Sequence, residues 1–171
     1  MTDPAFDDAT LALAARIFQL ARDGDADVLR QMLEHGLSPN MSNDKGDTLL
    51  MLAAYNQNVP AVRVLLDHGA DPDKPNDKGQ TPLAGVAFKG DLAIATMLVA
   101  HGAAVQGPAD GGRSALAVAA MFDRVELVQL LLDHGADPDA RDGAGSTALD
   151  AAKAMGATKT PAVIAAWKAR A

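Results

Sequence analysis

The chain repeats itself at a fixed spacing of 33 residues, and this period constrains its fold more than any other feature. One glycine marks each unit, at Gly46, Gly79, Gly112 and Gly145. His-Gly pairs return at the same spacing, beginning at His35, His68, His101 and His134. These positions align without insertions or deletions. A period near 33 that carries a turn and two short helices is typical of a solenoid, whose units bury their apolar faces against one another.

Each unit contains the same local signals in the same order. An Asp-Lys-Gly turn, at 44–46 and again at 77–79, supplies a glycine that accepts positive φ. Thr48 and Thr81 suit the N-cap of a short inner helix, and Pro82 suits its first position. An outer helix follows in each unit. The outer helices are predicted to end in the left-handed conformation at Gly69, Gly102 and Gly135.

These motifs resemble the ankyrin repeat. The family's T-P-L tripeptide is present at 81–83, and its L-L-x-x-G-A-D ending is present at 65–71 and 131–137. The similarity covers roughly residues 11–170, and the phrases AAYNQN and GVAFKG are similar to bacterial members. The resemblance implies an all-α solenoid of stacked helix-turn-helix units with β-turn fingers. It also implies a binding module whose partners cannot be read from its fold.

We interpret residues 1–171 as a single ankyrin-repeat domain with an atypical unit at each end. Its predicted parts are a flexible leader (1–9), an N-terminal capping repeat (10–42), three internal repeats (43–75, 76–108 and 109–141) and a C-terminal capping repeat (142–171). The first helix is expected to begin at Asp8 or Thr10. In the last unit, Thr160-Pro161 predicts a cap and a first turn, followed by a helix over 162–170 in which Trp167 packs into the end of the core.

The chain departs from the family pattern in two places. The histidine of T-P-L-H, which ties neighbouring loops by hydrogen bonds in the family, is replaced by Met51, Ala84, Ala117 and Asp150. The fingers therefore lack the tie that usually makes them rigid. The loop at 104–108, followed by a doubled glycine at 111–112, lacks the usual D-P-D turn and is predicted to be the loosest of the array.

Composition excludes several classes of protein. The net charge of −7 and the pI of about 4.9 oppose binding to a phosphate backbone, so we expect no nucleic-acid partner. The absence of cysteine excludes disulfides and thiolate metal sites. The acidic N-terminus is unlike a signal peptide, and no apolar run approaches the roughly 20 residues of a membrane span. We therefore expect a cytoplasmic protein that does not engage a membrane.

The residues that often carry chemistry have structural explanations in this chain. Each repeated histidine precedes a helix-ending glycine, where a partly cationic imidazole is favoured by the helix dipole. The segment 137–143 does not space its ligands as an EF-hand calcium loop requires. The pattern contains no histidine near a candidate serine nucleophile and no glycine-rich phosphate loop. We expect no metal, no cofactor and no enzymatic activity.

The functional signal lies at the end of each inner helix, which the resemblance places in the concave groove of the array. The predicted groove residues are Arg22, Tyr55, Asn56, Phe88, Lys89, Met121, Phe122 and Met155. Aromatic and Met side chains are enriched in the cores of protein interfaces. A mixed-charge rim is predicted on the fingers, at Asp44, Lys45, Asp47, Asp77, Lys78, Gln80 and Arg113. In an alternative interpretation, Phe88 or Phe122 packs beneath a neighbouring repeat.

The sequence therefore predicts a monomeric, non-enzymatic module that binds a partner protein through its groove, as an adaptor or scaffold. A dedicated inhibitor or immunity-type subunit of an enzyme is the alternative, for which acidic fingers would suit a basic target. Self-association through the apolar residues of the predicted groove, Tyr55, Phe88, Met121 and Phe122, is a further hypothesis. An inhibitor would lower the activity of its partner on mixing, whereas an adaptor would bind without changing it.

Overall fold

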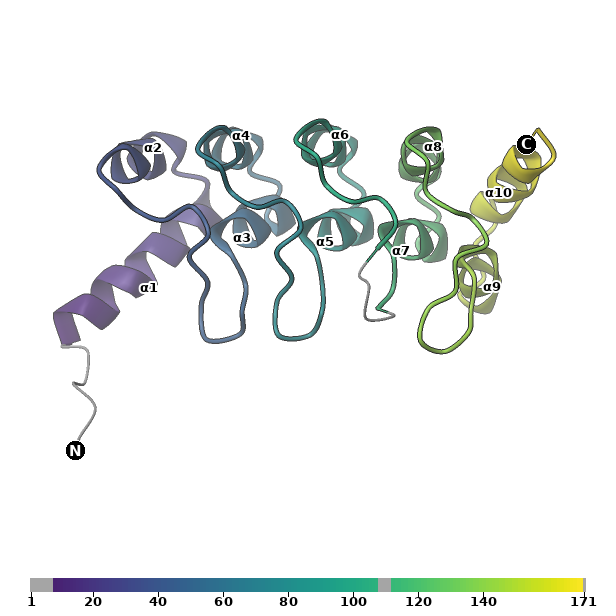
Figure 1. The fold of residues 1–171 in the computed structure, drawn as a ribbon, viewed down its shortest axis with the longest axis horizontal. Helices are drawn as coiled ribbons and strands as arrows, with labels where there is room; N and C mark the ends of the chain where they lie inside the picture. Colours follow the sequence, from purple (N-terminus) through teal and green to yellow (C-terminus); the bar gives the residue numbers. More distant parts are fainter. Residues whose placement is uncertain (1–7, 108–111, 171) are drawn as a thin grey trace.

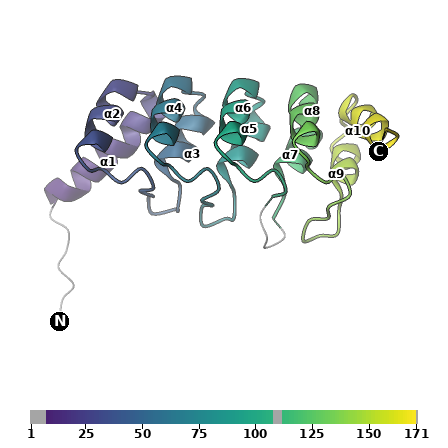
Figure 2. The same ribbon diagram turned by 45° about the horizontal axis from the view of Figure 1, so that its top comes forward.

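The computed structural model describes residues 8–107 and 112–170, which form ten α-helices in two rows and contain no strand (Figure 1). The inner row consists of α1 (Asp8–Asp23), α3 (Leu49–Tyr55), α5 (Pro82–Lys89), α7 (Ala115–Met121) and α9 (Ala148–Ala154). The outer row consists of α2 (Ala26–Glu34), α4 (Val59–Asp67), α6 (Leu92–Ala100), α8 (Val125–Asp133) and α10 (Thr160–Lys168). Figure 2 shows the same two rows with the connecting loops projecting from one side. The predicted all-α solenoid is confirmed.

Small side chains on the inner helices determine how closely the repeats stack. Ala53 and Ala54 of α3 are buried, as are Val86 and Ala87 of α5 and Ala119 of α7. The helix contacts run from each inner helix to the next one and to the outer helix of the same repeat. The result is one continuous core, which ends in the last unit at Ile164 with Trp167 packed against it, as predicted.

Four of the inner helices have an N-cap residue with a side-chain hydroxyl. The predicted caps Thr48 and Thr81 accept the N–H of the residue three positions later, and Ser114 and Thr147 do the same. At Thr147 the cap is reciprocal, because Asp150 accepts both the N–H and the hydroxyl of Thr147. These two hydrogen bonds, the N–H first, lower the pKa of the Asp150 carboxyl below its ordinary value.

The outer helices α2, α4, α6 and α8 end as the repeated His-Gly pairs predict. The glycine adopts positive φ, at 84° for Gly69 and 88° for Gly135. The N–H of the following residue closes the helix end, as in the bond from Ala70 to the carbonyl of Leu65. Each histidine Nδ1 lies 2.7–2.8 Å from the carbonyl oxygen four residues earlier. The four imidazoles therefore satisfy the last carbonyls of their own helices.

A second left-handed residue joins the inner helix to the outer helix in every repeat. Three repeats place glycine there, but Gln57 has φ of 60° and Asp123 has φ of 56°. Left-handed backbone is unfavourable for residues with a Cβ, although Asp tolerates it better than most. The two exceptions differ in their surroundings. Gln57 is exposed, whereas the Asp123 carboxylate accepts several hydrogen bonds from the last repeat.

Asp123 caps the last helix of the array from the preceding repeat. Its carboxylate accepts the N–H groups of Thr158, Lys159 and Thr160 and the Thr158 hydroxyl, at 2.8–3.2 Å. The N–H of Thr160 contributes most, and together these donors hold the pKa of Asp123 well below its ordinary range despite opposing desolvation. Oxygen acceptors at the start of a helix satisfy its free N–H groups.

The prediction that Thr160 caps a helix over 162–170 is wrong. Helix α10 begins at Thr160 itself and ends at Lys168. Thr160 is fully buried, and its hydroxyl donates to the carbonyl of Ala120 at 2.7 Å. The hydroxyl is therefore used for contact with α7, and the capping oxygens come from Asp123 in place of Thr160.

The predicted leader and the predicted loose loop both lie partly outside the described residues. Helix α1 begins at Asp8, so the last two residues of the predicted leader belong to the helix, and residues 1–7 lie outside the described part of the chain. The loop predicted to be the loosest, 104–108 with the glycines at 111–112, lies partly outside the described residues. Its looseness stays a prediction, as do the exact repeat boundaries.

Replacing Gln57 by glycine is expected to stabilise the protein by about 0.5–1 kcal/mol. Glycine removes the steric cost of the left-handed backbone, partly offset by the greater entropy of the unfolded chain. The measurement is urea denaturation followed by far-UV circular dichroism. Gln19→Gly, at an exposed position inside α1, is the matched control and should destabilise by about 1 kcal/mol. A less stable Gln57→Gly variant would contradict the assignment of strain.

Asp123→Asn is expected to lower stability at neutral pH and to flatten the loss of stability in acid. Because the pKa of Asp123 is lowered by folding, the unfolded chain takes up the proton first, and stability falls as pH drops below about 4. Asn keeps the left-handed backbone but cannot titrate. Denaturation curves at several pH values test this, with the exposed finger change Asp44→Asn as the control. Identical pH profiles for wild type and Asp123→Asn would exclude the capping role.

Candidate functional site

Three aromatic side chains at the C-terminal ends of successive inner helices form a continuous row, which we call the aromatic ladder: Tyr55, Phe88 and Phe122. The Tyr55 and Phe88 rings are parallel, with centroids 6.3 Å apart. Phe88 and Phe122 meet edge to face, with centroids 4.8 Å apart. Both arrangements are favourable for aromatic pairs. The ladder therefore links three repeats along the groove side of the inner row.

The ladder is open to solvent at two of its members. Tyr55 is 47% exposed and Phe88 is 40% exposed, although both are large and apolar. Phe122 is half-buried. The alternative in which Phe88 packs beneath a neighbouring repeat is therefore wrong. It fails because the small residues Val86 and Ala87 already fill the space between the inner helices.

A lysine covers one end of the ladder. The Lys89 ammonium lies 4.2 Å from the centroid of the Tyr55 ring, and it comes from the last turn of the neighbouring helix α5. A cation over an aromatic face is attracted by the negative face of the ring. This contact restrains both side chains and brings positive charge to the apolar row.

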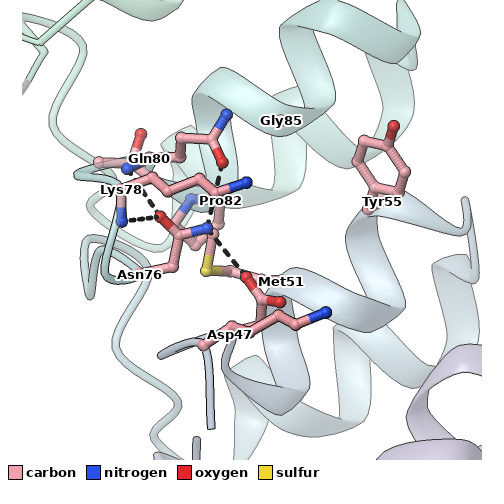
Figure 3. A pocket seen from close by; sticks show the side chains of 10 residues that line it. Asp47, Met51, Tyr55, Asn76, Lys78, Gln80, Pro82 and Gly85 are labelled. Atoms are coloured by element: carbon pink, nitrogen blue, oxygen red, sulfur yellow. Dashed lines mark hydrogen bonds between the residues drawn. The ribbon is translucent and has the colours of Figure 1, made fainter. Parts of the chain in front are cut away.

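Two hollows of about 360 Å³ each lie between the inner helices and the fingers. The first hollow is lined by residues that include Lys45, Asp47, Met51, Lys78 and Gly85, and Figure 3 shows Asp47, Met51, Asn76 and Lys78 facing Tyr55 and Gly85 across it. The second hollow is lined by residues that include Phe88, Arg113, Met121 and Phe122. Tyr55, Lys78, Gln80 and Gly85 line both. The hollows therefore adjoin along the ladder.

Asparagine and aspartate side chains shape the fingers from within. The Asn43 Oδ1 accepts the N–H groups of Lys45 and Asp47, both at 2.9 Å. Asn76 does the same for Lys78 and Gln80, at 3.0 Å (Figure 3). Asp142 repeats the arrangement in the last finger. Side-chain oxygens of Asn and Asp commonly fold turns in this way.

Neighbouring fingers and loops are also tied to one another. The N–H of Asp77 donates to the carbonyl of Lys45 at 3.1 Å, and Asn76 Nδ2 donates to Asp47 Oδ1 at 2.9 Å. Farther up the stack, Asn40 accepts the N–H of Asp71, and Asp73 accepts the N–H of Ala104. These bonds supply inter-repeat ties in a chain that lacks the usual histidine.

The remaining predicted residues divide into those at the hollows and those away from them. Asn56 is exposed and donates to the carbonyl of Leu52 at 2.8 Å. Arg22 is half-buried, and its carbonyl accepts Asn58 Nδ2 at 2.7 Å. Met155 is exposed at the end of α9. Neither these three residues nor the exposed finger residues Asp44 and Asp77 are part of the lining.

Sequence reasoning missed one of the four residues that the two hollows share, Gly85. It lies in the middle of α5, at the position that Leu52 occupies in α3 and Val118 occupies in α7. A glycine inside a helix is unfavourable, so its presence was a signal that the sequence carried. Met51, Asn76 and Pro82, which line the first hollow, were also missed as site residues.

Within residues 8–107 and 112–170, no three His, Cys, Asp or Glu side chains cluster as metal ligands would. In the same part of the chain, no helix has the length and apolar character needed to cross a bilayer. The four histidines instead bond within their own helices, as described above.

The fold and the ladder define a class of helical solenoid that presents side chains from successive repeats along one face. Residues 17–108 and 69–142 match the model of a family described as ankyrin repeats in three copies. The chain belongs to the ankyrin repeat family, whose repeats are generally protein-protein interaction modules and generally non-catalytic. The chain is also similar to an ankyrin repeat protein of Pseudomonas aeruginosa, with 49% identity over 65 residues. That match spans 36% of this chain and 38% of the relative.

Asn76→Ala is expected to loosen the finger between the two hollows and to destabilise the protein by about 1–2 kcal/mol, because it removes the acceptor of two backbone N–H groups and the tie to Asp47. Hydrogen exchange measured by mass spectrometry should show faster exchange in 76–81. The matched control Asn56→Ala removes a single exposed hydrogen bond and should leave exchange in the finger unchanged. Unaltered exchange in Asn76→Ala would contradict the role of the side chain.

Proposed function

We propose that this protein is a non-enzymatic adaptor that binds a partner protein through the groove formed by the aromatic ladder and the fingers. The observation that supports it best is the exposure of Tyr55 and Phe88 on a row of packed helices. Large apolar side chains gathered on one surface are characteristic of interaction sites. The ladder places them at fixed spacing across three repeats.

Preorganisation supports the same proposal. The ladder residues lie at the ends of short helices whose other faces are buried, and the fingers are folded by internal hydrogen bonds. A partner that docks on such a surface loses little entropy in ordering it. Aromatic side chains also have few rotatable bonds, so they contribute contact area at low cost. The surface of the groove is therefore already in its binding conformation before the partner docks.

Site-specific cross-linking tests the proposal directly. The photoreactive residue p-benzoylphenylalanine, placed at position 88 in the living source cell, should form an adduct with a partner protein that mass spectrometry identifies. The same residue at position 92 is the matched control, because Leu92 is 42% exposed but lies on the outer helix α6. The adduct at 88 should be lost when Tyr55→Ala and Phe122→Ala are combined.

Three other outcomes would each indicate a different binding surface or function. Adducts that form equally at 88 and 92 would place the binding surface outside the groove. An adduct with the mass of two copies of this chain would show self-association. A partner enzyme whose activity falls on mixing would identify an inhibitor in place of an adaptor.

A further inference from the structure

Charge is distributed unevenly between the groove and the rest of the molecule. The chain has 22 acidic and 15 basic residues. The lining of the two hollows nevertheless contains three basic residues, Lys45, Lys78 and Arg113, and one acidic residue, Asp47. Lys89 adds a fourth cation where it covers the Tyr55 ring. The lining of the candidate site is therefore basic within an acidic protein, and the exposed Asp44 and Asp77 of the same fingers lie outside this lining.

Ion pairs within the described residues neutralise little of the positive charge at the hollows. Asp47, the carboxylate of the lining, accepts hydrogen bonds from Asn76 and Asn43. Arg113 lies 3.9 Å from Asp142, a long separation for an ion pair, and remains exposed. Among the described residues, the ammonium groups of Lys45 and Lys78 have no carboxylate within ion-pair distance. Unpaired cations around an apolar floor favour an anionic ligand.

Gly85 shows where the ligand would enter most deeply. A Cβ built at this position would meet, among the described residues, the Cδ2 atom of Tyr55 at 3.8 Å, which is an ordinary contact. Packing within the chain therefore does not require glycine there, and its φ is not in the left-handed region. The glycine weakens α5 while keeping the junction of the two hollows open. A residue that lowers stability without a structural reason is expected at a functional site.

We propose that the groove binds an acidic peptide segment of the partner, with one large apolar side chain seated over Gly85 beside Tyr55 and Phe88. Asp or Glu residues on either side of this anchor would lie near Lys45 and Lys78 of the fingers and Lys89 of α5. This inference rests on the proposed protein-binding function and names the chemistry of the ligand. The apolar floor provides affinity, and the cations select the charge of the flanking residues.

The first test is selection of short random peptides displayed on phage against the wild-type protein. Clones should be enriched in which Asp and Glu flank a Trp, Phe, Leu or Met. A synthetic peptide of the enriched sequence, labelled with fluorescein, is then used as the probe in fluorescence polarisation. Binding should weaken with rising salt, as expected for charged groups at an exposed surface.

Variants at Gly85 separate a functional role from a structural one. Gly85→Leu places the residue found at position 52 into the hollow and should weaken probe binding at least about tenfold, because the anchor loses its seat. Gly85→Ala should raise Tm by roughly 2–4 °C while weakening the probe. A higher Tm with unchanged affinity would overturn the assignment of Gly85.

A charge variant tests the second half of the proposal. Lys78→Glu should weaken the probe at least about tenfold, since it reverses a charge that lines both hollows. Arg63→Glu changes the net charge equally from an exposed position on the outer helix α4 and should change affinity by less than about twofold. Equal effects of the two variants would overturn the proposed selection of acidic peptides.

The failure of this inference is distinguishable from failure of the groove itself. Enriched peptides that are neutral or basic but lose binding in Phe88→Ala would overturn the acidic ligand and keep the groove. Peptides that bind independently of both Phe88 and Gly85, or a library that yields no clone dependent on them, would overturn both.

Discussion

The close stacking of small side chains between neighbouring inner helices is the interaction on which the rest of the structure depends. A helix of seven or eight residues, such as α3 or α5, is too short to be stable alone in water. It persists because Ala53 and Ala54 on one helix, and Val86 and Ala87 on the next, are buried between repeats. Each unit completes the core of its neighbours, so the structure is propagated along the array.

Side-chain hydrogen bonds satisfy the polar groups that apolar stacking leaves without partners. Stacking alone would leave helix ends and finger amides without partners, and unpaired buried polar groups are costly. Asn43 and Asn76 satisfy the finger amides, Asn58 reaches the end of α1, and Asp123 satisfies the first turn of α10. Most of these residues act on groups in their own or the adjacent repeat. The fingers that Asn43 and Asn76 fold therefore have hydrogen-bonded amides without the histidine that the family uses.

The exposed ladder residues Tyr55 and Phe88 occupy positions that neither stacking nor capping requires. The core uses the faces of the inner helices that meet other helices, whereas Tyr55 and Phe88 lie at the helix ends beside the fingers. Their identity is therefore free to serve recognition. Gly85 belongs to the same group, because its neighbours leave room for a Cβ that the sequence does not supply. Residues of the candidate site that folding does not require therefore lie beside residues, such as Thr81 and Asn76, on which the fold depends.

Sequence alone was enough to predict the period, the two-row helical fold, the caps at Thr48 and Thr81 and the helix ends at the His-Gly pairs. The caps and the helix ends depend on residues within about one helical turn of one another, and the period is read directly from the repeated positions. The burial of Thr160 and the capping of α10 by Asp123 could not be predicted in this way, because the two residues are far apart in the chain and meet only in the folded array. The exposure of Phe88 and the position of Gly85 at both hollows likewise follow only from the folded structure. Exposure and hollows depend on how neighbouring repeats fill space, and the spacing of residues along the chain does not specify that packing.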